Sequence, residues 1–147
     1  MAELKIVEKR LDDIKPYEGN PRKNEKAVFA VKRSLEKFGF WNPIILNKDG
    51  VIIAGHTRFQ AATEEGLETV PCIILSHLTD EEERAFRLAD NRVSDFSRWD
   101  DNLLSHEMEA ISADDWEAFG FSEKQMKQLV PPEKCKCPKC GREFTEL

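Results

Sequence analysis

The sequence predicts a compact α/β domain, followed by an acidic helical segment and a short cysteine-rich tail. Three observations support this. Short apolar runs alternate with helix-like stretches over residues 1–78. Residues 79–123 hold 14 acidic against 4 basic side chains, and three of the four cysteines fall within residues 135–140. Alternating strand and helix patterns are typical of an α/β core. The predicted domains are 1–95 for the α/β domain, 96–130 for the helical extension and 131–147 for the tail.

The α/β core is predicted from segments taken in chain order. Residues 4–14 alternate loosely and favour an edge strand, whereas two prolines and a glycine break regular structure in residues 15–22. Asn24 can cap a helix whose apolar stripe ends at Gly39. The apolar runs 43–46 and 51–54 flank a Lys-Asp-Gly turn and predict a hairpin. A helix over 57–65, ending at Gly66, and a buried strand over 70–75 complete the core.

The acidic block contains three predicted helix starts. Thr79 and Glu82 form a capping box, and the helix that it opens carries Phe86, Leu88 and Ala89 as its apolar residues. A second helix is expected from residue 101, and a third follows a capping box at residues 122 and 125. Two prolines at 131–132 then separate this block from the tail.

Composition limits the classes of function. No apolar run approaches the roughly 20 residues of a membrane span, and the first residues lack an apolar signal core, so a cytoplasmic protein without membrane contact is expected. The net charge of −6 argues against non-specific wrapping of DNA, which needs many phosphate contacts. Residues 15–37 nevertheless hold seven Lys/Arg against three Glu, which leaves room for a focused basic face.

The segment 51–62 carries the main functional prediction. An apolar run stops at Gly55, three polar residues follow, and a helix begins. Backbone N–H groups at a helix start, beside the guanidinium of Arg58, suit a phosphate or another anion, and glycine lets the anion approach the backbone. His56 and Thr57 complete this predicted phosphate site. The alternative interpretation makes Thr57 a plain N-cap and Arg58 a surface ion-pair partner.

Two further basic or polar segments allow two interpretations each. Asn20 and Arg22 flank a proline, which is typical of a turn, or they lie at the mouth of the same pocket and contact phosphate. Lys32, Arg33 and Lys37 share a helix with the apolar stripe, so they form either a solvated face or a track for DNA.

Metal sites are predicted at two places. Asp90 and Asn91 can complete an octahedral Mg²⁺ site with phosphate oxygens, or they mark a helix end with asparagine in a left-handed turn. In the tail, Cys137 and Cys140 have the spacing of a zinc knuckle and Cys135 supplies a third sulfur. The fourth ligand would come from another chain, a water or a nearby side chain, and the alternative is a reduced, metal-free knuckle.

Four motifs in order resemble a known family. They are Asn20-Pro21-Arg22, the segment 38–44, the segment 54–62, and Val70-Pro71. Together they resemble the N-terminal domain of ParB-type partition proteins, within the ParB/sulfiredoxin fold, over residues 4–95. With residues 88–92 after the core, the chain is also similar to ParB-like domains of phages and mobile elements, some of which are joined to DNA methyltransferases.

The resemblance implies a nucleotide site. In ParB proteins the segment matching residues 55–58 holds the triphosphate of CTP at a helix start; Gly55 and Arg58 match, whereas His56 and Thr57 replace a glutamate and an arginine. CTP specificity and the hydrolysis cycle therefore do not carry over. Asp90 and Asn91 resemble the pair that holds metal and phosphates. In sulfiredoxins the catalytic cysteine follows this glycine, and here that residue is His56, which excludes that activity.

The expected function is that of a ParB-like nucleotide- and phosphate-binding, DNA-associated accessory protein of phage or mobile-element type. The expected ligand is CTP or ATP with Mg²⁺, and DNA binding is expected to be weak or indirect. Expected protein partners are a second copy, a methyltransferase or another phage protein. One alternative is an enzyme, either a nucleotide hydrolase, a metal-dependent nuclease or an ATP-dependent phosphotransferase, with His56 or Asp90 transferring a proton. The other is a protein-interaction adaptor with a vestigial pocket.

Overall fold

The computed structural model describes the backbone of residues 4–21, 25–111, 116, 119–129, 134–136 and 143–145. The chain divides into two units, Met1–Arg98 and Trp99–Leu147, which are treated separately below.

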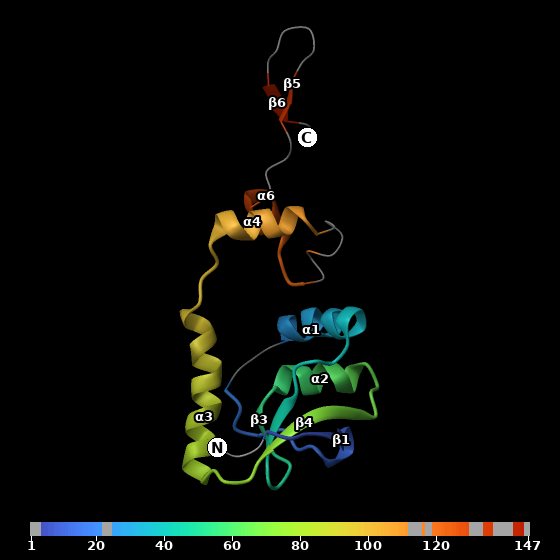
Figure 1. Ribbon diagram of the computed structural model, residues 1–147, viewed down its shortest axis with the longest axis vertical. Coiled ribbons are helices and arrows are strands. Elements are labelled where there is room, and N and C mark those ends of the chain that lie inside the picture. The colour runs from blue at the N-terminus through green and yellow to red at the C-terminus, as the bar shows by residue number, and fades with distance from the viewer. Residues whose placement is uncertain are drawn as a thin grey trace. The chain divides into compact units, whose positions relative to one another are not determined.

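The first unit is built on a four-stranded mixed sheet (Figure 1). Its strands are β1 (Ile6–Arg10), β2 (Ile44–Asn47), β3 (Ile52–Ala54) and β4 (Thr69–Leu75), in the spatial order β1-β4-β2-β3. The β1 and β4 strands are antiparallel, β4 and β2 are parallel, and β2 and β3 form an antiparallel hairpin. The predicted edge strand, hairpin and buried strand are therefore confirmed.

Helices cover this sheet in layers. They are α1 (Glu25–Phe38), α2 (His56–Glu64) and α3 (Asp80–Val93), with short 3-10 turns at Leu11–Asp13 and Ser94–Phe96. The α2 helix lies against the sheet, α1 packs on α2, and α3 runs beside β3 (Figure 1). The core between sheet and helices includes Ile44, Leu46, Ile52, Ala62 and Val70, all essentially inaccessible to solvent. The α/β class predicted from the alternating pattern is confirmed.

The β2–β3 turn is closed by side-chain hydrogen bonds and also holds the start of the loop at residues 15–21. Asn47 Oδ1 accepts hydrogen bonds from Asp49 N at 3.0 Å and Val51 N at 2.9 Å, which closes the turn. Gly50 has a φ of +78°, and a Cβ there would lie 2.8 Å from Asp13 O, so glycine is required on both counts. The backbone of Lys15 is hydrogen-bonded to this hairpin. Lys15 N donates to Gly50 O at 2.8 Å, and Lys15 O accepts from Ile52 N at 2.9 Å. The hairpin thus fixes the start of the loop at residues 15–21.

The α3 helix begins as predicted, but the side chains that it buries are charged. Its capping box is present, because Thr79 N donates to Glu82 Oε2 at 2.8 Å and Glu82 N donates to Thr79 Oγ1 at 3.3 Å. However, Leu88, one of the apolar residues picked out in the sequence, is 60% exposed. The buried side chains are Glu83 and Arg87, at 9% and 4% exposure. The contact of α3 with the sheet edge is therefore made by charged groups rather than by the apolar residues of the helix.

Arg87 joins three parts of the first unit. Its Nη2 lies 3.8 Å from Glu83 Oε2, its Nε donates to Ile52 O at 3.4 Å, and its guanidinium stacks 3.7 Å from the centroid of the Tyr17 ring. Glu83 Oε2 also accepts from Asn47 Nδ2 at 3.1 Å. Buried charges are tolerated when they are paired and hydrogen-bonded, as these are. The Arg87 cluster, meaning these five residues, therefore ties α3, the hairpin and the loop before α1 together.

The described part of the second unit includes helices and a small hairpin. They are α4 (Asp101–Glu109), α6 (Glu123–Leu129), β5 (Lys134–Lys136) and β6 (Glu143–Thr145), with β5 and β6 antiparallel. Asp100 caps α4 by accepting from Asn102 N and Leu103 N, both at 3.1 Å. The predicted capping box before α6 is confirmed, since Ser122 N donates to Gln125 Oε1 at 3.0 Å. Within the described ranges, every helix is too short or too polar to cross a bilayer.

Replacing Arg87 with alanine tests the Arg87 cluster. The change leaves the Glu83 carboxylate buried without its countercharge, and it also removes the stack on Tyr17. We expect a loss of about 3–5 kcal/mol of unfolding free energy, measured by urea denaturation. Arg84→Ala is the matched control, because Arg84 is exposed on the same helix, and it should change stability by no more than about 0.5 kcal/mol. Equal effects of the two changes would contradict a structural role for the cluster.

Candidate functional site

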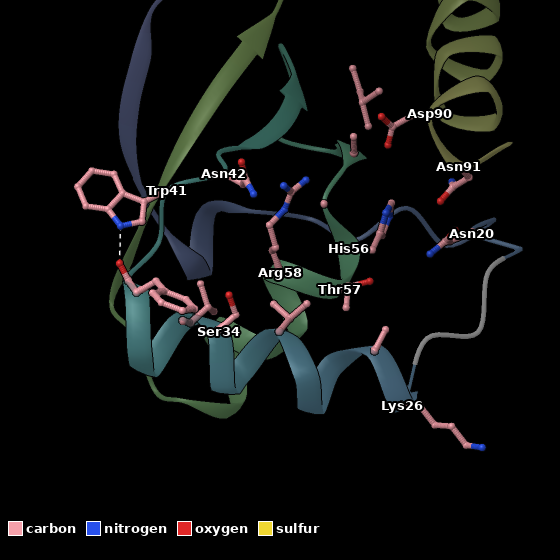
Figure 2. Close-up of a pocket in the computed structure, with 18 residues that line it drawn as sticks. Asn20, Lys26, Ser34, Trp41, Asn42, His56, Thr57, Arg58, Asp90 and Asn91 are labelled. Carbon is pink, nitrogen blue, oxygen red and sulfur yellow. Dashed lines mark hydrogen bonds between the residues drawn. The ribbon is translucent and has the colours of Figure 1, made fainter. Parts of the chain in front are cut away.

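A cleft of about 890 Å³ opens in the first unit (Figure 2). Its walls come from α1, the segment after α1, the turn between β3 and α2, and the last turns of α3. Almost all sequence-predicted residues of the phosphate and Mg²⁺ sites line it. These are Asn20, Gly55, His56, Thr57, Arg58, Asp90 and Asn91. Arg22, predicted at the mouth of the same pocket, lies outside the described residues.

The β3–α2 turn depends on Gly55. This residue is the N-cap of α2 with a φ of +106°, a conformation that only glycine adopts readily. No side chain caps the helix, and its first intrahelical bond runs from Phe59 N to Gly55 O at 2.9 Å. The alternative of Thr57 as the N-cap is therefore wrong, because Thr57 lies inside the first turn of α2. The first turn of a helix presents backbone N–H groups and the positive end of the helix dipole, and this one faces the cleft.

Arg58 folds back over this turn. A Cβ built on Gly55 would lie 3.2 Å from Arg58 Nη2 and 3.3 Å from Arg58 Nε, so the guanidinium rests against the glycine backbone. Arg58 is half-buried, and within the described part of the chain its side chain makes no hydrogen bond or ion pair. Burial lowers the pKa of Arg58, and the nearby Asp90 carboxylate opposes this change. The alternative of an exposed surface ion pair does not describe this side chain.

His56 is held by a residue that the sequence analysis did not name. Its Nε2 accepts a hydrogen bond from Tyr17 N at 3.3 Å. Burial lowers the pKa of His56, and the positive charge of Arg87 lowers it further. The ring is therefore neutral near pH 7, and since Nε2 accepts, we assign the proton to Nδ1. Because its basic nitrogen is already engaged, His56 is better suited to donating a hydrogen bond than to acting as a general base.

Asp90 and Asn91 face the Gly55 turn from α3 (Figure 2). Asn91 Nδ2 donates to Arg87 O at 2.8 Å, and α3 continues to Val93. The alternative of Asn91 in a left-handed turn is wrong, because every positive φ in the described backbone belongs to glycine. Among the described residues, no three His, Cys, Asp or Glu side chains converge as a metal site. A metal beside Asp90 would thus take its remaining ligands from a bound molecule or water.

The far end of the cleft was not predicted as part of a site. It is formed by residues of α1 and the segment that follows, including Ser34, Phe38, Trp41 and Asn42 (Figure 2). Trp41 is 81% exposed, and its Nε1 donates to Phe38 O. A usable sequence signal was present, since an aromatic residue between Gly39 and Pro43 has no strand or helix in which to pack. The sequence gave a weaker signal for Tyr17 and Arg87. Only the spacing of Glu83 and Arg87, which is that of a helical ion pair, could have drawn attention to Arg87.

The cysteines divide into two cases. Cys72 lies buried in β4 as predicted, and burial raises the pKa of its thiol to about 11. In the tail, Cys135 lies in β5 opposite Phe144 of β6, whereas Cys137 and Cys140 fall outside the described residues. The zinc knuckle therefore stays a prediction.

Comparison with known proteins identifies the family. The model of the ParB N-terminal domain family matches residues 2–92. This chain belongs to that family. It is 40% identical over 82 residues to the ParB-like nuclease domain-containing protein YnaK of Escherichia coli, a match that spans 55% of this chain and 94% of that relative. It is 35% identical over 79 residues to Stage 0 sporulation protein J of Bacillus subtilis, which spans 50% of this chain but only 28% of that relative.

A solved structure of a ParB protein supports the fold. The C-terminally truncated chromosome-partitioning protein ParB from Caulobacter crescentus, complexed with CTP-γ-S, superposes with a TM-score of 0.62 over 85% of this chain and 70% of that one. The sequences are 19% identical, so this match establishes a shared ParB fold. The family resemblance carried by the four sequence motifs is confirmed.

Gly55→Ala tests whether the turn between β3 and α2 requires glycine. The added Cβ meets Arg58 and Ile44, and alanine resists a φ of +106°, so we expect a loss of about 1–3 kcal/mol in urea denaturation. The matched control is Gly66→Ala, where φ is +69° and nothing lies within 4 Å of the added atom. Gly66→Ala reports the cost of the backbone conformation alone. A smaller loss for Gly55→Ala than for Gly66→Ala would show that the turn tolerates a side chain.

The lowered pKa of His56 predicts a pH dependence of stability. Below pH 6.5 the unfolded state takes up a proton at this residue before the folded state does. Stability should therefore fall as the pH drops from 6.5 towards the lower folded-state pKa, and His56→Gln should reduce that fall. The measurement is the urea midpoint of both proteins between pH 8 and pH 5. Both proteins at pH 8, where the histidine is neutral in either state, provide the reference. Parallel curves would contradict the assignment.

Proposed function

We propose that the cleft binds the phosphates of a nucleoside triphosphate together with Mg²⁺, in a DNA-associated accessory protein of phage or mobile-element type. The observation that carries this proposal is the half-buried guanidinium of Arg58, which lies against Gly55 and makes no hydrogen bond or ion pair with the described residues. None of the Arg58 nitrogens is among the fully buried atoms that lack a partner, so they stay accessible and can bind an anion in the cleft through charge-assisted hydrogen bonds. A phosphate supplies several acceptors.

The groups around Arg58 favour a phosphate over a smaller anion such as a carboxylate. The start of α2 contributes backbone N–H groups, and the Nδ1–H assigned to His56 adds a neutral donor. Asp90 is the only acidic side chain among the described residues that line the cleft, and by itself it would repel phosphate. A Mg²⁺ ion between Asp90, Asn91 and the phosphate oxygens removes this repulsion, since magnesium commonly uses one or two carboxylates plus substrate phosphates.

Relatives support the choice of ligand class. Caulobacter crescentus ParB, which has the same fold, was solved in complex with CTP-γ-S. In this chain His56 and Thr57 differ from the family pattern, so CTP and ATP are both candidates. DNA association rests on the family membership and on the basic segment 15–37.

An enzyme is the second candidate, favoured by the E. coli relative, which is called a ParB-like nuclease domain-containing protein. Two-metal nucleases usually hold their ions with several carboxylates, and the described wall of this cleft has one. The geometry therefore supports phosphate binding better than two-metal hydrolysis. The His56 ring, with Nε2 engaged by Tyr17, is also a poor candidate for the general base.

Nucleotide titration tests the proposed function. Melting temperatures with CTP, ATP or GTP plus Mg²⁺ identify the triphosphate, because a ligand that binds only the folded state stabilises it. Calorimetry with that triphosphate should then show at least about tenfold weaker binding by Arg58→Ala, since a charge-assisted contact in a half-buried site contributes on the order of 1.5–3 kcal/mol.

Arg10→Ala is the matched control. Arg10 is exposed, pairs with Asp12 at 3.1 Å and does not line the cleft, so its removal should leave the affinity unchanged. If no triphosphate raises the melting temperature, the proposal fails and the adaptor with a vestigial pocket becomes the better description. Equal affinities of wild type and Arg58→Ala would refute the assignment of Arg58.

A further inference from the structure

Tyr17 lies outside the cleft but is hydrogen-bonded to two residues that line it. Its backbone N–H donates to His56 Nε2 at 3.3 Å, and its carbonyl oxygen accepts from Asn20 N at 3.1 Å. His56 and Asn20 belong to the described wall of the cleft (Figure 2), and Tyr17 does not. One residue thus connects the start of α2 to the loop at residues 15–21.

The Tyr17 ring is held on the buried charge of Arg87. The Arg87 guanidinium lies 3.7 Å from the centroid of the ring, and Arg87 is 4% exposed. A cation stacked on an aromatic face is attracted more strongly at a desolvated site than at an exposed one. Arg87 is itself bonded to Ile52 O and paired with Glu83, so the ring rests on a group that is fixed at the sheet edge.

The turn that follows Tyr17 is shaped to its ring. A Cβ at Gly19 would lie 2.9 Å from Tyr17 Cε1 and 3.0 Å from Tyr17 Oη, so glycine allows the ring to lie over its own turn. The bond from Asn20 N to Tyr17 O closes this turn. Two residues before Tyr17, the backbone of Lys15 is bonded to the β2–β3 hairpin. Tyr17 therefore lies in a short segment that is anchored by the hairpin and by the stacked ring.

The bond from Tyr17 decides which group His56 offers to a ligand. A neutral imidazole has one donor and one acceptor nitrogen, and the hydrogen bond at one nitrogen sets the protonation of the other. Because Nε2 accepts from Tyr17 N, the donor is Nδ1–H, which a phosphate oxygen can accept. Without that bond the ring would divide between its two tautomers, and only part of the population would present the donor.

We propose that Tyr17 is a positioning residue of the phosphate site. It selects the donor that His56 presents and holds Asn20 at the cleft, so both groups are oriented before the ligand arrives. Groups that are already oriented lose less conformational entropy when the ligand binds, which raises its affinity. The inference deepens the phosphate binding proposed above and rests on it.

Tyr17→Leu and Tyr17→Phe test this role by calorimetry with the triphosphate that the melting temperatures identify. Leucine removes the aromatic face, so the backbone N–H is no longer held against His56 Nε2. Its affinity should be at least about threefold weaker, because an aligned neutral hydrogen bond contributes a factor of roughly two to ten. Phenylalanine keeps the face on Arg87, so Tyr17→Phe should stay within about twofold of the wild type.

The tautomer of His56 provides a readout that a loss of stability alone would not change. Nitrogen NMR of isotope-labelled histidine, without ligand and at about pH 8, observes the neutral ring. The wild type and Tyr17→Phe should show a protonated Nδ1 and an unprotonated Nε2. In Tyr17→Leu the two nitrogens should shift towards the mixture of a free neutral imidazole, since no donor selects one tautomer.

Phe29→Leu is the matched control. Phe29 also lies under a guanidinium, that of Arg33 at 5.6 Å, but it is not among the residues that line the cleft, so the change should alter neither affinity nor tautomer. Gly19→Ala is a second variant in case Tyr17→Leu does not fold. It retains every residue of the Arg87 cluster, and its Cβ displaces the Tyr17 ring, so it should act in the same direction as Tyr17→Leu.

Affinity and tautomer must change together. A change in only one of them in Tyr17→Leu or Gly19→Ala, a change in neither, or equal effects of Phe29→Leu would overturn the role of Tyr17 and leave the proposed phosphate binding in place. If the wild type binds none of the triphosphates, the proposed function fails and the positioning role fails with it.

Discussion

The first unit depends on one buried positive charge. Arg87 is 4% exposed, and a guanidinium at that depth must be surrounded by acceptors or by an aromatic face. It obtains both, from Glu83, from Ile52 O in the hairpin and from the Tyr17 ring. Satisfying one charge therefore brings three segments that are far apart in sequence to a single point.

The cleft follows from that arrangement. Because Arg87 is fixed against β3, the next turn of α3 brings Asp90 and Asn91 opposite Gly55. Because Tyr17 stacks on Arg87, its backbone N–H reaches His56 Nε2 and selects the tautomer of the ring. The charge of Arg87 also lowers the pKa of His56 and keeps the ring neutral. A residue outside the cleft thus sets the protonation and position of residues inside it.

The positive charge of the cleft is concentrated in a small volume. The Arg58 guanidinium and the N–H groups at the start of α2 place positive charge on a few atoms, which suits a compact anion such as a triphosphate.

Much of the local structure of this protein could be predicted from its sequence. The capping boxes at Thr79 and Ser122, the Asn47–Gly50 turn and the glycine at position 55 each depend on bonds within four residues, so their sequence pattern is sufficient. The four spaced motifs likewise identified the ParB family without coordinates.

The sequence did not indicate which face of α3 is buried, because the buried side chains, Glu83 and Arg87, are charged. Burial of Arg87 becomes favourable only when Tyr17, Ile52 and Glu83 converge, and their spacing along the chain gives no sign of it. The same holds for the partner of His56, a backbone N–H that lies far from it in the sequence. Short-range bonds are encoded by neighbours in the chain, whereas the surroundings of a buried charge exist only once distant segments have packed.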